Sequence, residues 1–286
     1  FYICLIKEEI IKLDEKIIIS CPICASDRGF DLTRLFSTSE IPVSICKKCS
    51  FVYLNPRHTD EWYKRYYNSS HDRVLDNKRR RDIISYEKRQ YNKGKSVLDF
   101  ILKNSQIDIT DMRVLEVGCT SAGILRYFRD MGATYVAGVD PESEYVDYAT
   151  NISSIDVFQG FIQQFNSKKF DLIILRHVVE HLADPLGDLK HIYSLLKDNG
   201  IVFVETPSLY SMDIASKWCK NFHVEHPNIF SDRTLELLLV KSGYKVVTKP
   251  LNGNRTHLRF LAIKSKDGGG VSSYDNWRKN VIKNFL

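Results

Sequence analysis

The sequence predicts an α/β fold built on a parallel sheet, and three stretches carry this prediction. Residues 114–125 combine an apolar strand, a turn of small residues at Gly118 and the start of a helix, and residues 136–140 add a second strand that ends at Asp140. Further along, residues 169–182 place an apolar run behind an acid, as expected for a strand buried on both faces. Strands that alternate with helices indicate a parallel sheet.

The turn after the first strand favours a nucleoside ligand. Small residues let the backbone approach a ligand at a helix N-terminus, and an acid about 20 residues further on can accept hydrogen bonds from both hydroxyls of a ribose. A dinucleotide site requires Gly-x-Gly-x-x-Gly, whereas the window from Gly118 has Thr120 and Gly123 at the later positions. Glu116, before the turn, would repel a pyrophosphate and suits a zwitterionic ligand that carries a positive charge.

The pattern acid-x-Gly-x-small-x-small that begins at Glu116 resembles motif I of class I S-adenosylmethionine-dependent methyltransferases, and Asp140 matches the ribose-binding acid of their second motif. Thr120 and Ala122 stand where that family often has glycine. The resemblance covers about residues 112–264 and implies a Rossmann-like, seven-stranded sheet with S-adenosyl-L-methionine as cofactor. The residues expected to hold the cofactor are Glu116, Gly118, Cys119, Thr120, Asp140, Pro141, Gly160, Phe161 and Arg176.

The remaining elements follow in the order that this resemblance implies. Residues 195–200 predict the end of a helix with the final glycine as its cap, and residues 201–205 predict the fifth strand. Ser231 is expected to cap the N-terminus of another helix, and two closing strands are expected near residues 244–249 and 258–263.

Two Cys-x-x-Cys pairs upstream, Cys21 with Cys24 and Cys46 with Cys49, favour a tetrahedral structural zinc site. Their separation is slightly longer than the usual zinc pattern, and disulfides are the alternative. The total of seven cysteines is odd, no signal peptide is visible, and a cytoplasmic enzyme keeps its thiols reduced, so we expect zinc. Iron would use the same four ligands, and this alternative stays open.

The length of 286 residues suits one α/β domain and a smaller module. We expect an N-terminal segment with a small zinc-ribbon module over residues 1–58, a helical linker or lid over 59–105, a methyltransferase domain over 106–265 and a tail over 266–286. No apolar run approaches the ~20 residues that cross a bilayer, so we expect a cytoplasmic protein without a membrane span. The first residue, Phe1, suggests that the sequence begins inside a longer protein.

The net charge of +6 is mild and does not call for a nucleic-acid partner. Much of the positive charge lies in the linker, which includes the run Asn77–Arg81. A basic run on a helix is usually a solvated face, and the alternative is a lid that meets the phosphates of a nucleotide sugar or a nucleic acid. The sequence does not indicate an oligomeric state.

Two Cys-x-x-Cys pairs, the segment 51–56, an aromatic helix and a methyltransferase core are together similar to the zinc-containing methyltransferases of bacterial surface-glycan and deoxysugar pathways. This resemblance implies a carbohydrate or nucleotide-sugar substrate. In the sugar C-methyltransferases of that group, a Glu-His-x-x-Tyr-Phe-Ser segment supplies the catalytic base, and residues 225–231 match it from Glu225 and His226 onward. Ile229 replaces the tyrosine, so O- and C-methylation both stay open.

His226 is the expected general base, because imidazole titrates near neutral pH, and Glu225 is the group expected to orient it. A capping or buried structural histidine is the alternative. A second cluster, His177, Glu180 and His181, is expected on one face of a helix at the sheet edge. It resembles the Glu-x-x-Glu-His metal site of quinone-pathway O-methyltransferases, but histidine replaces the first acid, so substrate contact is favoured over metal.

Two other functions stay open. Residues 176–179 lack the Asn/Asp-Pro-Pro-aromatic turn of the enzymes that methylate exocyclic amines of nucleobases. Methylation of a ring nitrogen in RNA by a zinc-ribbon enzyme is the alternative activity. A zinc-ribbon binding module with a degenerate cofactor fold is the non-enzymatic alternative.

Overall fold

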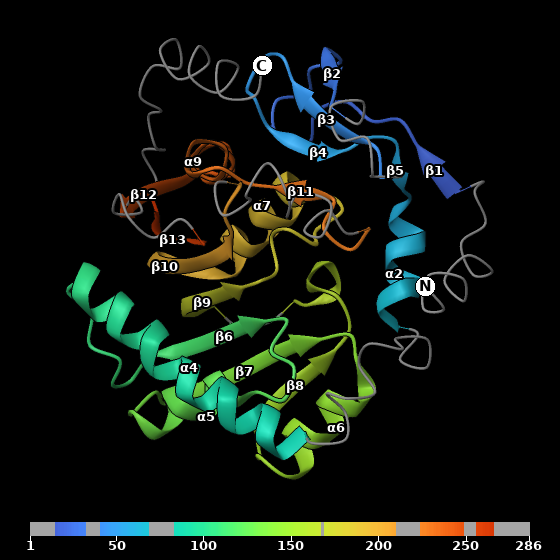
Figure 1. The fold of residues 1–286 in the computed structure, drawn as a ribbon. Helices are drawn as coiled ribbons and strands as arrows, with labels where there is room; N and C mark the ends of the chain where they lie inside the picture. The colour runs from blue at the N-terminus through green and yellow to red at the C-terminus, as the bar shows by residue number, and fades with distance from the viewer. Residues whose placement is uncertain are drawn as a thin grey trace.

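The computed structural model describes residues 15–32, 41–68, 83–166, 169–209, 224–248 and 256–265. A seven-stranded sheet with the order β12-β13-β10-β9-β6-β7-β8 forms its centre. Helices α4, α5 and α6 lie on one side of this sheet, and α7 and α9 lie on the other (Figure 1). The predicted α/β fold is therefore confirmed.

The central sheet is parallel from β8 to β10, and β13 runs antiparallel to both of its neighbours. Its first strand ends just before the Gly118 turn and its second ends at Asp140, as predicted. The strands are β6 (Arg113–Val117), β7 (Tyr135–Asp140), β8 (Asp156–Gln159), β9 (Phe170–Arg176), β10 (Leu196–Pro207), β12 (Tyr244–Thr248) and β13 (His257–Lys264).

Several helix ends follow from local side-chain chemistry. Ser231 caps α9 as predicted, because its hydroxyl accepts a hydrogen bond from the backbone N–H of Thr234. Asp184 caps α7 in the same way, with Pro185 in the first helical turn. The helices are α2 (Asp60–Asn68), α4 (Ile83–Asn104), α5 (Gly123–Asp130), α6 (Ser143–Asn151), the 3-10 helix η3 (Ile162–Gln164), α7 (Pro185–Leu195) and α9 (Asp232–Lys241).

Strand β9 shows why the centre of the sheet has an almost unbroken apolar sequence. Leu172 and Ile174 pack into the cluster under α4 and α5, whereas Ile173 and Leu175 pack into the cluster under α7 and α9. All four side chains are fully buried. Successive residues of a strand point to opposite faces, so a strand covered on both faces has no polar side.

A second, four-stranded sheet joins the N-terminal module to the rest of the protein. Its strands are β2 (Gly29–Asp31), β3 (Val43–Cys46), β4 (Val52–Leu54) and β11 (Asn228–Ile229), in the order β11-β4-β3-β2. Strand β11 comes from the late part of the chain and pairs with β4. The rings of Phe51 and Phe230 lie 5.1 Å apart in the main core cluster. The module therefore shares a core with the methyltransferase-like part. Strands β1 (Lys16–Ile17) and β5 (Arg57–His58) form a separate two-stranded sheet.

Two local predictions are wrong. Helix α7 ends at Leu195 and β10 begins at the next residue, so Gly200 lies within β10 and caps no helix. The pairing of β10 with β9 shifts register between Leu196 and Ile201, and Asn199 has a φ of 62° there, so the turn-forming residues mark a bulge. The second error is the helix expected from His177. Residues 177–184 form an irregular turn, and the helix begins only at Pro185.

Part of the predicted linker, residues 69–82 with the basic run Asn77–Arg81, lies outside the described residues, and so does the tail 266–286. Among the helices that the structure describes, none combines the length and apolar composition needed to cross a bilayer.

Candidate active site

The loop between β6 and α5 passes three times through the left-handed region, with φ of 67° at Gly118, 46° at Thr120 and 57° at Ala122. Residues other than glycine seldom adopt this conformation, which explains why related loops often carry glycine. Backbone hydrogen bonds from Gly118 N–H to the Val139 oxygen (2.7 Å) and from Ala122 N–H to the Cys119 oxygen (2.8 Å) hold the loop. Thr120 and Ala122 therefore adopt the left-handed conformation that is typical of glycine, although neither is glycine.

Asp140 ties this loop to the end of β7. Its Oδ2 accepts a hydrogen bond of 2.8 Å from the backbone N–H of Thr120, and its Oδ1 accepts one of 3.0 Å from the N–H of Glu142. The side chain is buried. A carboxylate oxygen can accept more than one hydrogen bond, so Asp140 can hold the loop and still bind hydroxyl groups of a ligand.

Glu116 lies at the end of the neighbouring strand β6 and is also buried. Burial raises the pKa of its carboxyl well above the usual range, the charge of Arg176 opposes this rise, and Asp140 adds to it. Among the described residues, its Oε2 has no hydrogen-bond partner. A buried oxygen without a partner costs roughly 1–3 kcal/mol, and a ligand with an ammonium group would satisfy it. Glu116 and Asp140 together thus fit a ligand that combines an ammonium group with a ribose.

The end of β8 contributes Gly160 and Phe161 to the same edge of the sheet. Gly160 donates its N–H to the Asp140 backbone oxygen at 3.0 Å and has a φ of 152°. A Cβ at this glycine would lie 2.7 Å from the Phe158 ring, so a larger residue would have to displace that ring and adopt an unfavourable φ. The N–H of Phe161 donates to the Gln164 side chain at 2.9 Å. A ligand that used this N–H would displace Gln164. Pro141 follows Asp140 directly on the same edge.

Glu205, at the carboxyl side of β10, joins several cations that sequence reasoning did not connect. Its Oε1 lies 2.9 Å from Nε of Arg176, and its Oε2 accepts a hydrogen bond of 2.5 Å from Nε of Arg259. Nε2 of His177 lies 3.5 Å from the same Oε1. The sequence signal that could have indicated these contacts is an acid at the end of an apolar strand, because a buried carboxylate needs cationic partners.

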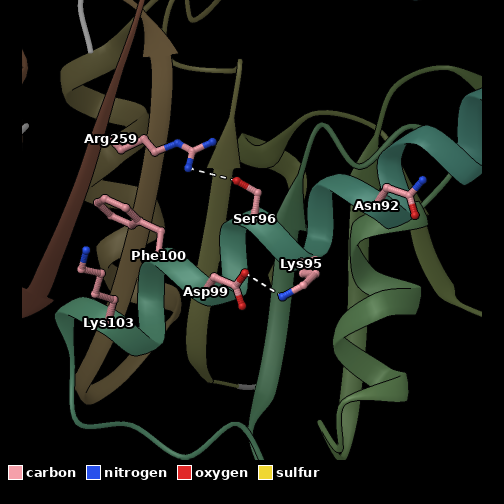
Figure 2. A pocket seen from close by; sticks show the side chains of 7 residues that line it. All are labelled: Asn92, Lys95, Ser96, Asp99, Phe100, Lys103 and Arg259. Carbon is pink, nitrogen blue, oxygen red and sulfur yellow. Dashed lines mark hydrogen bonds and ion pairs between the residues drawn. The ribbon is translucent and has the colours of Figure 1, made fainter. Parts of the chain in front are cut away.

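Arg259 also reaches an outer pocket of about 410 Å³ beside α4 (Figure 2). Its Nη1 donates to the Ser96 hydroxyl at 3.2 Å, and the Lys95 and Asp99 side chains form an ion pair of 2.9 Å on the same helix. The pocket lining contains none of the predicted site residues. It is therefore separate from the candidate active site.

Glu180 lies beneath the irregular turn and holds His177. Nδ1 of His177 is 3.1 Å from Oε1 of Glu180, and the Thr206 hydroxyl donates to Oε2 at 2.8 Å. Burial opposes ionisation of Glu180, but the hydrogen bond from His177 and the charges of His181 and His177 outweigh it and lower the pKa of this carboxyl. Glu180 is therefore a buried anion with both oxygens engaged.

The predicted cluster of His177, Glu180 and His181 is kept in part: His177 contacts Glu180 as predicted, but the turn does not continue as a helix. His181 instead faces His226 from the late segment, with ring centroids 4.6 Å apart at 75°. One ligand atom from each of Glu180, His181 and His226 lies within 4.8 Å of the others, so these three could hold a metal ion. His181 and His226 come from the two histidine motifs that the sequence analysis treated as alternatives, and the structure brings them together in one site.

Helix α2 fastens the late segment through tyrosines that sequence reasoning did not assign to the site. The Tyr63 hydroxyl donates to the Val224 backbone oxygen at 3.0 Å, and the Tyr66 hydroxyl donates to the Glu225 carboxylate. The Tyr67 hydroxyl lies 2.8 Å from Nδ1 of His181. Aromatic residues spaced along one helix were the signal that could have indicated these contacts.

The four cysteines of the N-terminal module meet in one cluster, with all four sulfur atoms within 4.8 Å of one another. Sγ of Cys21 is 3.5 Å from that of Cys49, and Sγ of Cys24 is 3.5 Å from that of Cys46. A disulfide requires about 2.05 Å, whereas thiolates around zinc lie about 3.8 Å apart, given a Zn–S bond of about 2.3 Å. All four are free cysteines, and the cluster fits a tetrahedral ion.

Comparison with known proteins agrees with the α/β fold of the central sheet. The sequence model of a family described as methyltransferase domain matches residues 86–249. The ubiquinone biosynthesis O-methyltransferase of Actinobacillus pleuropneumoniae serotype 5b (strain L20) is 31% identical over 121 residues, which cover 38% of this chain and 51% of that protein. The mitochondrial enzyme of the same name from Rattus norvegicus is 27% identical over 198 residues, 62% of this chain and 53% of that protein. The chain thus spans about half the length of these relatives.

Two solved structures show the same fold. Magnesium protoporphyrin IX methyltransferase (ChlM) from Synechocystis PCC 6803 with bound SAH has a TM-score of 0.54 and 16% identity, and the match covers 72% of this chain and 100% of that one. A S-adenosylmethionine-dependent methyltransferase from Clostridium acetobutylicum ATCC 824 has a TM-score of 0.51 and 12% identity, over 64% of this chain and 92% of that one.

Proposed function

Because the chain belongs to the methyltransferase domain family, we propose that it transfers the methyl group of S-adenosylmethionine to a small acceptor molecule. The observation that carries this proposal is the pair of buried carboxylates, Glu116 and Asp140, at the ends of adjacent parallel strands. Ligands of open α/β sheets bind at this edge. One of the two carboxylates has an oxygen without a partner, as expected for a site that completes itself with a cationic ligand.

In this proposal the cofactor supplies a methyl group on a positively charged sulfur, and the protein holds it in place. Asp140 accepts hydrogen bonds from the ribose, and Glu116 meets the ammonium group. The backbone of the loop at Gly118, Cys119 and Thr120, together with Pro141, encloses the ligand. The backbone at Gly160 and Phe161 receives the adenine, and Arg176 adds a positive charge beside Glu116.

For the acceptor we propose a carbohydrate, as a nucleotide sugar or a surface-polysaccharide precursor. The resemblance of residues 225–231 to the sugar methyltransferase segment supports this choice, and so does the attachment of that segment to the cysteine module through β11. A histidine of the pair His181 and His226 removes the acceptor's proton, and Glu225 helps to orient the site.

We propose methylation of an oxygen atom. Ile229, which stands where the sugar C-methyltransferases carry tyrosine, is 5% exposed and packs in an apolar cluster with Val43, Leu54 and Leu209. A side chain in that cluster lies among apolar groups of the module and offers no hydroxyl to the acceptor. The relatives that match this chain are also named O-methyltransferases.

A phenolic hydroxyl of a quinone precursor is the second candidate acceptor. The observation that favours it is the name shared by the curated relatives, ubiquinone biosynthesis O-methyltransferase. The same proton acceptor and cofactor site would serve both acceptor classes, so a direct assay has to decide between them.

We further propose that Cys21, Cys24, Cys46 and Cys49 hold one structural zinc ion, which fits their sulfur geometry. Reduced thiols are typical of the cytoplasm, where we place the protein. In this proposal residues 1–58 contain the zinc module, residues 59–105 form the linker or lid, residues 106–265 form the methyltransferase domain and residues 266–286 form a tail.

Two measurements test the proposed function. Calorimetry with S-adenosylhomocysteine should show binding, and absence of binding would refute the cofactor assignment. Incubation with S-adenosylmethionine and separate panels of nucleotide sugars and hydroxylated benzoates, read by mass spectrometry, should give a product heavier by one methyl group from the sugar panel. A product from the benzoate panel alone would replace the carbohydrate assignment by the quinone-precursor one.

A further inference from the structure

The hydrogen bonds of His181 define which of its ring nitrogens carries hydrogen. Nδ1 lies 2.8 Å from the backbone oxygen of Glu225. A carbonyl oxygen can only accept a hydrogen bond, so at this distance Nδ1 must be the donor. An unprotonated Nδ1 would place its lone pair against the lone pairs of the oxygen. Neutral His181 is therefore the Nδ1–H tautomer, and its Nε2 holds a lone pair.

Tyr67 completes the same arrangement. Its hydroxyl donates to the Glu225 backbone oxygen at 3.3 Å, so its own oxygen, 2.8 Å from Nδ1 of His181, can share the Nδ1 hydrogen with that carbonyl in a three-centre hydrogen bond. Within the described part of the chain, both hydrogen bonds of the His181 ring are made by Nδ1. The ring is partly exposed. Nε2 is thus the ring atom left for an acceptor molecule.

Helix α2 fixes the carbonyl on which this assignment depends. Tyr63 bonds the backbone oxygen of Val224, and Tyr66 bonds the side chain of Glu225. Tyr67 of the same helix donates to the Glu225 backbone oxygen itself at 3.3 Å. Helix α2 thus holds the residue before this carbonyl, the Glu225 side chain and the carbonyl that faces Nδ1 of His181.

His177, the other histidine of this turn, is not suited to take a proton. Its Nδ1 faces the Glu180 carboxylate at 3.1 Å, and its Nε2 faces the Glu205 carboxylate at 3.5 Å. Both ring nitrogens of His177 thus face carboxylates of the protein, and neither is left for an acceptor molecule. In the case of His181, a carboxylate oxygen of Glu180, which is buried and ionised, lies within 4.8 Å of a ring nitrogen. Such an anion stabilises the imidazolium that forms when Nε2 is protonated.

We propose, on the basis of the proposed methyl transfer, that His181 is the catalytic residue that accepts the acceptor's proton at Nε2, with Tyr67 as a positioning residue. The acceptor's O–H bond breaks, its proton forms an N–H bond with the Nε2 lone pair, and the O–H electron pair stays on oxygen. That oxygen forms the new bond to the methyl carbon, while the pair of the broken S–C bond stays on the sulfur and neutralises it. The Nδ1–H bond to Glu225 is kept throughout, and loss of the Nε2 proton to solvent restores His181.

The tautomer can be measured without knowing the acceptor. We would record long-range ¹H–¹⁵N spectra of the full chain labelled in histidine, with S-adenosylhomocysteine present. His181 should show a protonated Nδ1 and an unprotonated Nε2, the form that is less common for free histidine. His191 is an internal control of opposite sign, because its Nε2 lies 2.9 Å from the Phe165 backbone oxygen and must carry the hydrogen. His181→Gln and His191→Gln assign the two signals.

Two results would overturn the proposal. One is a hydrogen on Nε2 of neutral His181. The other is selective broadening of the His181 and His226 signals by micromolar Mn²⁺, which would make Nε2 a metal ligand. The binding of S-adenosylhomocysteine in the same sample reports on the proposed function separately, because His181→Gln should leave that affinity within a few-fold.

Once an acceptor is identified, the rates give a second test. His181→Gln should lower kcat roughly 10²–10⁴-fold, the usual range for loss of a general base, while His191→Gln should keep the rate. Tyr67→Phe should lower kcat with little change in KM and should move the acidic limb of the pH profile. Loss of rate in His226→Gln together with an active His181→Gln would transfer the role to His226 and refute the proposal.

Discussion

Asp140 accepts the backbone hydrogen of Thr120 at 2.8 Å, so the carboxylate proposed to bind the ribose also fixes the loop that would enclose it. Thr120 stands in a left-handed conformation that costs a non-glycine residue roughly 1–2 kcal/mol. The charge-assisted hydrogen bond from Asp140 offsets this cost. In the proposed site, binding of the cofactor and the shape of the loop would therefore be coupled through one side chain.

Asp140→Ala should weaken binding of S-adenosylhomocysteine by roughly 1.5–3 kcal/mol for each charged hydrogen bond lost. Calorimetry measures the change. Asp156→Ala, at an exposed position of the neighbouring strand β8, is the matched control and should bind normally. Unchanged affinity in Asp140→Ala would remove this residue from the cofactor site.

Glu116→Gln should stabilise the cofactor-free protein while weakening its affinity. Because burial raises the pKa of Glu116, its contribution to stability is present below the unfolded value of about 4.3 and falls as pH rises through the folded value. The glutamine variant does not titrate, so its free energy of unfolding at pH 7 should exceed that of the parent. Urea unfolding across pH 4–8 gives the comparison.

The affinity loss in Glu116→Gln should depend on the ammonium group of the ligand. S-adenosylhomocysteine should bind less tightly to the variant, whereas methylthioadenosine, which lacks the amino-acid part, should bind equally to both proteins. Equal losses for the two ligands would mean that Glu116 does not meet the ammonium group.

Cys24→Ser should abolish metal binding and destabilise the N-terminal module, because a structural zinc site contributes directly to folding. Elemental analysis of the parent should find about one zinc per chain, and the variant should have none. Cys119→Ser alters a buried thiol outside the cluster and should keep the zinc. A full zinc content in Cys24→Ser would contradict the four-cysteine site, and iron in place of zinc would change the metal but not the ligands.

Because of Glu180, the free energy of unfolding of the protein should decrease as the pH is lowered. Its pKa is lowered in the folded state, so its contribution is present above the unfolded value of about 4.3 and is lost as pH falls through the folded value. Glu180→Gln should lose on the order of 1–3 kcal/mol at pH 7, since the ionic partner of His177 is gone, and should show a flatter decline below pH 5. Asp147→Asn, at an exposed position of α6, should match the parent at every pH. A pH dependence identical to that of the parent would show that Glu180 is not ionised.

The strands were predictable because their signals are local. The apolar run of β9, the end of β7 at Asp140 and the cap at Ser231 each depend on residues within a few positions of one another. The same local reasoning misread Gly200, since a glycine marks a bulge as readily as a helix end.

The composition of the site could not be predicted in the same way. His181 and His226 meet only because the late segment returns to pair with β4, a contact between distant parts of the sequence. His177 keeps the predicted contact with Glu180, but its φ of 54° breaks the helical spacing, and the approach of its Nε2 to Glu205 could not be predicted from that spacing. The tyrosines of α2 that hold Glu225 likewise depend on tertiary packing, and spacing along a helix does not show which residues it will touch.

The pairing of β11 with β4 has a consequence for biosynthesis. Val52 and its partner Ile229 are separated by 177 residues of chain. At a translation rate of 5–20 residues per second, the edge of β4 stays unpaired for roughly 9–35 s before β11 has been synthesised. An unpaired strand edge invites association with other chains. Nascent chains that end before β11 should therefore depend on chaperones or aggregate, whereas complete chains should not.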